Sequence, residues 1–210
     1  MSYLKLPLEK YIDDASSENP TPGGGSVSAL VGALGTTMAS MSANFTIGKK
    51  KFEDVEAEVK EILAKCDRAR NELLNLMEDD IKSYGKLSEA YGLPKSTDDE
   101  KKKRTETIQD ALKDAMGAPL KTVRCCLAIL KEIRRLADIA NPNLISDVGV
   151  AALFTNAALL GGKLNVDINL SFLKDHALVQ EVNNEVTEAE TKSNDLLNDT
   201  MQVVNSKIKK

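Results

Sequence analysis

The chain reads NPTPGGGSVSALVGALGTTMASMSANF from Asn19 to Phe45, and no charged residue occurs between Asn19 and Lys49. The prolines restrict the backbone, the glycines carry no side chains and Ser26 favours an N-cap, so a tight loop leading into a helix is predicted. The start of such a helix suits an anionic or strongly polar ligand. A capped loop without a ligand is an equally good interpretation. The run matches neither the P-loop nor the dinucleotide-binding fingerprint.

The predicted helix from Ser26 to Phe45 is uncharged, which raises the question of a membrane span. It carries too many hydroxyl and amide side chains for one. Its small residues, among them Gly32, Ala33 and Gly35, would let other helix backbones approach closely. We therefore expect this helix at the centre of a bundle or at a subunit interface, and no membrane partner.

The overall composition excludes several classes of protein. The 28 basic and 32 acidic residues give a net charge of −4, and aromatics make up only 4%, which disfavours nucleic-acid binding. The N-terminus lacks an apolar core of signal-peptide length, so a cytoplasmic protein is expected. Three cysteines and one histidine supply neither a disulfide framework nor a His-rich zinc site, and no metal is expected.

Helical periodicity continues after the first helix. A second helix is predicted from about Phe52 to Tyr91, where apolar residues recur at steps of three and four. Thr97 and Glu100 are spaced as a capping box and open a third helix. Gly117-Ala118-Pro119 should kink or break this helix, and Asn141-Pro142-Asn143 closes it.

The last third of the chain contains two more predicted helices and one different element. Ser146 is expected to cap a helix from Asp147 to Leu160 that Gly161-Gly162 stops. Leu164 to Leu170 alternates apolar and polar residues, the pattern of a half-buried extended segment. A polar amphipathic helix follows from about Phe172 to Lys207. With no internal repeat and no linker, residues 1–210 predict one all-α domain, a helical bundle with long central helices and one short extended segment.

Asp80 is the leading candidate for chemistry. At about 100° per residue, Leu73 and Tyr84 fall within about 40° of Met77 on the helix, and Asp80 lies about 60° away, at the edge of the apolar stripe. A carboxylate there must be paired, hydrogen-bonded or raised in pKa, and a raised pKa suits a general acid or base. A structural ion pair with Lys or Arg is the alternative.

Other reactive side chains are weaker candidates. His176 is expected to be exposed at the start of the last helix. Cys125 and Cys126 lie in an apolar helix and are expected to be inert thiols. Lys49, Lys50 and Lys51 follow the first helix, where they are either partners of its dipole or a binding site for a polyanionic tail.

Several motifs occur in one order and at familiar spacing: Pro20-Thr21-Pro22-Gly23-Gly24-Gly25-Ser26-Val27, Asn44-Phe45-Thr46-Ile47-Gly48-Lys49-Lys50, Glu78-x-Asp80, Leu93-Pro94-Lys95, Asn141-Pro142-Asn143 with Ser146-Asp147, and Asn165-Val166-Asp167-Ile168-Asn169. Together they resemble the cyclodeaminase/cyclohydrolase family. This family contains stand-alone methenyltetrahydrofolate cyclohydrolases and the cyclodeaminase domain of formiminotransferase-cyclodeaminase. The resemblance runs from the N-terminus to about residue 175. Ser28 and the Cys125-Cys126 pair depart from the family pattern without touching the site motifs.

The resemblance implies an all-helical subunit that works as a homodimer, with a folate-binding cleft near the subunit contact. It implies Asp80 as the catalytic residue and needs no cofactor beyond the tetrahydrofolate substrate. The substrate-binding candidates are Gly23, Gly24, Gly25, Ser26, Asn44, Lys49, Lys50, Tyr84, Asp147, Asn165 and Asn169.

Two reactions of this family pass through a related adduct at the same carbon, so one carboxylate does not separate them. The bifunctional proteins carry an additional transferase domain, for which 210 residues leave no room, so we expect the cyclohydrolase reaction, with the cyclodeaminase reaction as the alternative. A non-catalytic helical dimerisation module is an alternative of another class. The position of Asp80 among apolar neighbours and the uncharged glycine loop argue against it.

Overall fold

The computed structural model describes residues 2–209, and these form six α-helices, three short 3-10 helices and no strand. The α-helices are α1 (Leu8–Ala15), α2 (Gly24–Asn44), α3 (Glu56–Tyr91), α4 (Asp98–Ile139), α5 (Ile145–Leu170) and α6 (His176–Ile208). The 3-10 helices are η1 (Tyr3–Lys5), η2 (Lys50–Val55) and η3 (Pro142–Leu144). The predicted all-α fold is confirmed.

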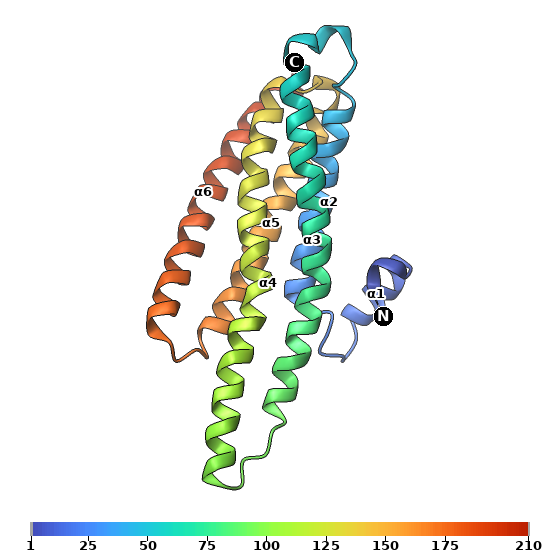
Figure 1. Ribbon diagram of the computed structural model, residues 1–210. Coiled ribbons are helices and arrows are strands. Elements are labelled where there is room, and N and C mark those ends of the chain that lie inside the picture. Colours follow the sequence, from blue (N-terminus) through green and yellow to red (C-terminus); the bar gives the residue numbers. More distant parts are fainter. Residues whose placement is uncertain (1, 210) are drawn as a thin grey trace.

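Four long helices form the bundle (Figure 1). Going round it, α2 packs on α3, α3 on α4, α4 on α5 and α5 again on α2, while α6 lies against α4 and α5. Successive long helices run in opposite directions, so the start of α2 lies at the same end of the bundle as the end of α5. The short α1 lies outside the bundle, and its Tyr11 hydrogen-bonds Ser26 of α2.

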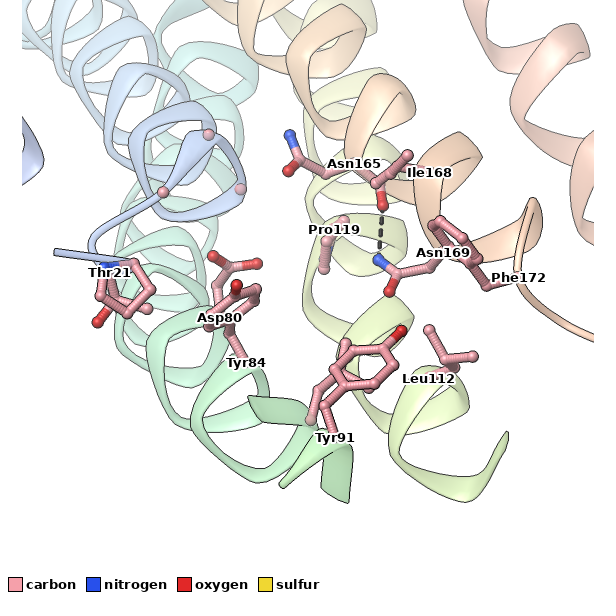
Figure 2. A pocket seen from close by; sticks show the side chains of 16 residues that line it. Thr21, Asp80, Tyr84, Tyr91, Leu112, Pro119, Asn165, Ile168, Asn169 and Phe172 are labelled. Atoms are coloured by element: carbon pink, nitrogen blue, oxygen red, sulfur yellow. Dashed lines mark hydrogen bonds between the residues drawn. The ribbon is translucent and has the colours of Figure 1, made fainter. Parts of the chain in front are cut away.

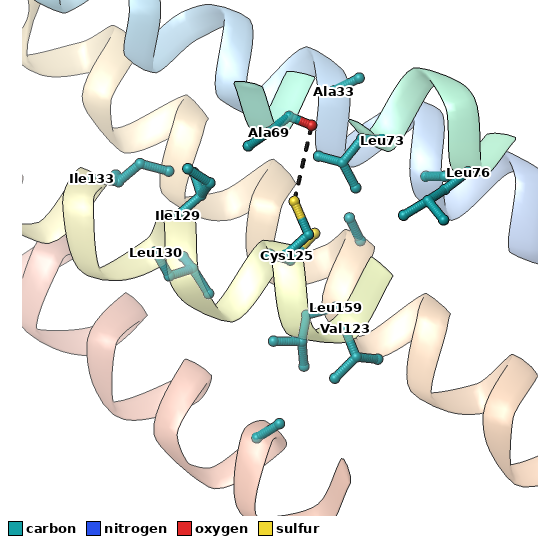
Figure 3. Close-up of a cluster of buried hydrophobic side chains, with 14 of the residues drawn as sticks. Ala33, Ala69, Leu73, Leu76, Val123, Cys125, Ile129, Leu130, Ile133 and Leu159 are labelled. Atoms are coloured by element: carbon teal, nitrogen blue, oxygen red, sulfur yellow. Dashed lines mark hydrogen bonds between the residues drawn. The ribbon is translucent and has the colours of Figure 1, made fainter. Parts of the chain in front are cut away.

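Apolar side chains from all four helices fill the centre of the bundle (Figure 3). The small residues of α2 set how closely the helices approach. A Cβ added at Gly32 would lie 3.0 Å from the Cys126 sulfur, 3.2 Å from the Ala158 Cβ and 3.3 Å from Leu73 Cδ1. One glycine of α2 therefore touches three other helices, which explains why this helix is central.

Both α2 and the segment Pro142–Leu170, which contains α5, are long and apolar enough to cross a membrane by length and composition alone. In the bundle, 61% of the apolar window of α2 and 50% of that of the second segment are buried. Their apolar character is thus partly explained by packing inside the protein. The remainder of each helix presents apolar side chains on an outer face.

The predicted extended segment from Leu164 to Leu170 is wrong, because these residues are the last two turns of α5. Helix α5 has apolar residues on two faces. Val166 and Leu170 are buried in the bundle, whereas Leu164 and Ile168 lie on the outer face. Residues four apart share a helix face, so two apolar faces separated by polar residues imitate the alternation of a strand.

The predicted helix ends are also wrong in places, because glycines here serve close packing. Gly161 and Gly162 lie inside α5. A Cβ added at Gly161 would collide with Ser28, and one added at Gly162 would lie 3.3 Å from the carbonyl oxygen of Pro119. Helix α2 begins at Gly24 with Gly23 as its N-cap, so Ser26 is its third residue and not its cap.

Three further differences concern helix boundaries. Helix α4 runs without interruption through Pro119, and α5 begins at Ile145 with no side-chain cap from Ser146. The predicted capping box at the start of α4 is confirmed: the Thr97 hydroxyl accepts from the Glu100 N–H, and the Glu100 carboxylate accepts from the Thr97 N–H at 2.9 Å. Helix α1 has no counterpart in the sequence prediction.

Two glycines allow a direct test of the close contact between α2 and α5. A Cβ at Gly35 would lie 3.0 Å from the Thr155 backbone nitrogen and 3.2 Å from the Ala151 carbonyl oxygen, and backbone atoms cannot move aside. We predict that Gly35→Ala lowers the free energy of unfolding by about 1–3 kcal/mol in urea denaturation. Gly85→Ala, at an exposed position in the last third of α3 with nothing within 4 Å, should raise it by about 0.5–1 kcal/mol. If Gly35→Ala left the free energy of unfolding unchanged, the close contact between α2 and α5 would be contradicted.

Candidate active site

A cavity of about 290 Å³ opens at one end of the bundle, where α2 and α4 begin and α3 and α5 end (Figure 2). Its walls come from the loop before α2 and from all four bundle helices. The lining residues are Pro20, Thr21, Gly23, Gly24, Gly25, Asp80, Tyr84, Leu87, Tyr91, Leu112, Ala115, Pro119, Asn165, Ile168, Asn169 and Phe172. Among residues 2–209, this lining includes one carboxylate and no Lys, Arg or His.

The carboxylate of Asp80 lies against the first turn of α2. Its Oδ2 accepts a hydrogen bond of 2.8 Å from the Ser26 N–H. A Cβ at Gly25 would lie only 2.6 Å from Asp80 Cγ, so this position has no room for a side chain. Because the N-cap Gly23 has no side-chain oxygen, Asp80 supplies from α3 the acceptor that a capping residue normally supplies.

Burial raises the pKa of Asp80 to about 6, and the hydrogen bond from Ser26 opposes this rise. No ion pair with Lys or Arg contributes to the shift. The structural ion pair that the sequence left open is therefore not formed by the described residues. A carboxyl group with a pKa near neutrality can both take up and return a proton at physiological pH.

Two asparagines of α5 face Asp80 across the cavity (Figure 2). Asn165 Nδ2 donates to the Gly161 carbonyl at 2.8 Å, and Asn169 Nδ2 donates to the Asn165 carbonyl at 2.7 Å. Since a carbonyl can only accept, these bonds fix which end of each amide is nitrogen. Both amide oxygens are left without a partner in the described chain and can accept hydrogen bonds from a ligand.

The rest of the cavity wall is apolar and partly aromatic. Leu87 and Leu112 are buried, whereas Tyr84, Tyr91 and Phe172 are 42%, 45% and 57% exposed. These rings offer flat faces at the edge of the cavity to a planar ligand. The site therefore combines an acid–base group, two hydrogen-bond acceptors and exposed rings.

The structure brings together some of the predicted site residues and not others. The pocket contains Gly23, Gly24, Gly25, Asp80, Tyr84, Asn165 and Asn169. Ser26 is fully buried behind it and takes part through its N–H.

The remaining predicted residues, Asn44, Lys49, Lys50 and Asp147, lie at the other end of the bundle. Asn44 ends α2 and Asp147 lies in the first turn of α5. Asn141, which lies shortly before α5, joins these two helix termini because its side chain donates to the Phe45 carbonyl. A helix of 21 residues spans roughly 30 Å, which separates these residues from Asp80 of the same chain.

The other reactive side chains lie outside the cavity. His176 is exposed at the start of α6, as predicted. Burial raises the pKa of the Cys125 thiol to about 12 and that of Cys126 well above its ordinary value, which agrees with the prediction of inert thiols. Neither residue lines the pocket.

Sequence reasoning missed α1 and, with it, Tyr11. This tyrosine is 4% exposed, and its hydroxyl shares a hydrogen bond of 2.9 Å with the hydroxyl of Ser26. The signal was present in the spacing of Leu8, Tyr11, Ile12 and Ala15, which follows a helical period over one short stretch.

Comparison with known proteins shows which family the chain belongs to. The family model described as Formiminotransferase-cyclodeaminase matches residues 7–188. This chain belongs to that family. The resemblance seen in the sequence is thus confirmed.

Three relatives illustrate the range of the family. A methenyltetrahydrofolate cyclohydrolase of Methylorubrum extorquens is 42% identical over 174 residues, which cover 83% of this chain and 84% of the relative. The formimidoyltransferase-cyclodeaminase of Mus musculus is 29% identical over 89% of this chain, which spans only 34% of that protein. The crystal structure of a formiminotetrahydrofolate cyclodeaminase from Thermotoga maritima matches with a TM-score of 0.88 and 32% identity over 98% of both chains.

The raised pKa of Asp80 predicts a change in stability with pH. The pKa rises from 3.8 to about 6 on folding, so the folded state binds the proton more tightly and stability falls as pH rises from about 4 to about 6. We predict that Asp80→Asn raises the free energy of unfolding by about 1–3 kcal/mol near pH 7.5 and much less near pH 4, measured by urea denaturation.

Asp79→Asn is the matched control, because Asp79 is exposed and pairs with Lys82 at 3.0 Å. It should change stability by less than about 0.5 kcal/mol at either pH. If Asp80→Asn shifted stability equally at both pH values, the pKa of Asp80 would not be raised.

Proposed function

We propose that this protein converts 5,10-methenyltetrahydrofolate and water into 10-formyltetrahydrofolate. The observation that carries the proposal is the lone carboxylate of Asp80, held in an apolar pocket without a neighbouring cation. Such a site attracts the positively charged methenyl compound. The 42% identical relative named methenyltetrahydrofolate cyclohydrolase supports the same reaction.

In the proposed mechanism, water adds to the electrophilic carbon between N5 and N10. Asp80 stabilises the cation in its ionised form and takes a proton from the attacking water. It then returns that proton to N5 as the carbon–N5 bond breaks, and it takes the hydroxyl proton of the adduct as the formyl carbonyl forms on N10. The overall reaction releases one proton to solvent, which Asp80 can transfer because its pKa lies near neutrality.

The pocket also suggests how the substrate lies. Its polar groups include the free oxygens of Asn165 and Asn169 together with Asp80, and all of them accept hydrogen bonds. The pterin ring system carries several N–H donors, whereas the glutamate end carries carboxylates. We propose that the pterin and the methenyl carbon occupy the cavity and that the glutamate tail leaves it past the exposed rings of Tyr84, Tyr91 and Phe172.

The cyclodeaminase reaction is the second candidate. There N10 attacks a formimino carbon on N5 and ammonia leaves, so the same carboxylate faces the same carbon. The Thermotoga maritima structure, titled a formiminotetrahydrofolate cyclodeaminase, is 32% identical and supports it. The higher identity of the cyclohydrolase relative, 42%, favours the first reaction.

We predict that the purified protein removes the methenyl chromophore of methenyltetrahydrofolate, with or without a chelator and without added cofactor. Ammonia release from formiminotetrahydrofolate is measured in parallel. Rapid ammonia release with no effect on the methenyl compound would make the cyclodeaminase reaction correct. If neither the methenyl chromophore were lost nor ammonia released, a non-catalytic module would be favoured.

Asp80→Asn should lower turnover at least about a hundredfold, the usual scale for the loss of an acid–base group. Because this variant is expected to be at least as stable as the parent near pH 7.5, unfolding would not account for the loss. Asp79→Asn serves again as the control and should retain turnover. Near-normal activity of Asp80→Asn would remove Asp80 from the mechanism.

We also propose that the protein is a homodimer formed through the outer faces of α2 and α5. Val27, Leu34 and Met41 lie seven residues apart on α2 and are all exposed. On α5, Leu153, Phe154 and Leu164 are exposed and do not line the cavity. Adjacent apolar stripes on two packed helices form the type of surface that a second copy covers.

A two-fold axis across α2 would set the two copies of this helix antiparallel. The end of the partner's α2 would then lie near the start of α2 in the first subunit. This arrangement would bring Asn44, Lys49 and Lys50 of one copy toward the pocket of the other. It accounts for the division of the predicted site residues between two ends of one chain.

Mixing two variants tests this shared site. Lys49→Ala/Lys50→Ala should weaken substrate binding more than it lowers the saturated rate, with a smaller loss at high salt. Mixed with Asp80→Asn under conditions that allow subunit exchange, it should regain about a quarter of the parental activity at low substrate, because half of the dimers are mixed and each has one intact site. Activity equal to the sum of the two separate variants, or an active 22.8 kDa monomer in light scattering, would contradict the shared site.

A further inference from the structure

The position of the Asp80 carboxylate depends on a helix turn that has almost no side chains. Gly23, Gly24 and Gly25 precede Ser26, so Ser26 carries the first side chain that can fix this turn against another element. Its N–H is the donor to Asp80 at 2.8 Å. Whatever holds Ser26 therefore also holds the partner of Asp80.

The Ser26 side chain is held by α1. Ser26 is fully buried, and its hydroxyl hydrogen-bonds the Tyr11 hydroxyl at 2.9 Å. Tyr11 is the one buried residue of α1. Burial raises the pKa of Tyr11, so its phenol stays protonated at neutral pH and the hydrogen bond persists.

The N-terminal arm, residues 2–22, is attached at a second point close to Asp80. Glu78 Oε1 accepts from the Ser2 hydroxyl at 3.0 Å and from the Leu4 N–H at 3.3 Å. Glu78 lies on α3 two residues before Asp80. The arm is thus fixed to α3 near its start, through Ser2 and Leu4, and to α2 near its middle, through Tyr11.

We propose that Tyr11 is a positioning residue for Asp80: by binding the Ser26 hydroxyl, it holds the first turn of α2 so that the Ser26 N–H stays directed at the carboxylate. Tyr11 does not line the cavity. Its contribution to turnover rests on the proposed function. Its contribution to the charge state of Asp80 does not.

Few other groups can influence the pKa of Asp80. Among the described residues, the ionisable side chains beside it are Tyr84 and Tyr91, which line the same cavity, and Tyr11, on which the charges of Asp80 and Glu78 both act. The residues that α2, α4 and α5 contribute to the cavity wall are not ionisable. Since the hydrogen bond from Ser26 lowers the pKa of Asp80, weakening this bond must raise it.

The experiment compares two tyrosines of the same arm. Tyr11→Phe keeps the ring and removes the hydroxyl that binds Ser26. Tyr3→Phe removes a hydroxyl that donates to Asp14 at 2.7 Å within the arm and has no contact with Ser26. The pKa of Asp80 is measured in each protein by carboxyl NMR titration of the free enzyme, with Asp80→Asn to assign the signal.

Tyr11→Phe should raise the pKa of Asp80 by about half a unit to one unit and lower kcat/KM about two- to tenfold at pH 6, with a smaller loss at pH 8. Tyr3→Phe should leave both unchanged. Ser26→Ala retains the N–H and removes the same hydrogen bond from its other side. It should therefore shift the pKa of Asp80 in the same direction, and it provides the test if Tyr11→Phe folds poorly.

An unchanged pKa and pH profile in Tyr11→Phe and in Ser26→Ala would overturn the proposal. So would equal shifts in Tyr11→Phe and Tyr3→Phe, because they would show a general loosening of the arm. If Tyr11→Phe shifts the pKa of Asp80 but the parent protein turns over neither folate, the role of Tyr11 is supported and the proposed function is rejected.

Discussion

The first turn of α2 lies directly against the carboxylate of Asp80, and the rest of the site depends on this contact. It requires a helix start without side chains, because Gly25 leaves no room for a Cβ beside the carboxylate. The same absence of side chains continues along α2, where Gly32 and Gly35 allow α3, α4 and α5 to approach the backbone. One property of α2 therefore positions the bundle helices and the candidate acid–base group.

This contact also balances two opposing effects on Asp80. Burial favours the neutral acid, whereas the Ser26 N–H and the positive end of the α2 dipole favour the carboxylate. Burial is the larger effect, so the pKa rises from its ordinary value of 3.8 to about 6 despite the hydrogen bond. A fully buried carboxyl without the helix start would stay protonated, and an exposed one would stay ionised, and neither would exchange protons readily at neutral pH.

The elements that the sequence predicts well are those with one apolar face. Helices α3, α4 and α6 have this pattern, and Thr97 marks the start of α4 through its capping box. Helix α5 has two apolar faces, and no single period describes it. Asn165 and Asn169 nevertheless share a face in a strand and in a helix alike, since four residues separate them. Tyr11 and the wall residues Leu112 and Phe172 reach the site only through tertiary packing, which one short segment does not reveal.

No described residue of the cavity wall is a cation, and this has a consequence for the net charge of the occupied site. A methenyl cation beside ionised Asp80 forms a neutral pair. Hydrolysis yields a neutral formyl compound and a proton, and Asp80 can hold this proton, so the pair is neutral again. In the proposed reaction, the low-dielectric pocket thus carries no net charge before or after the bond to N5 breaks, and the attraction that binds the substrate no longer acts on the product.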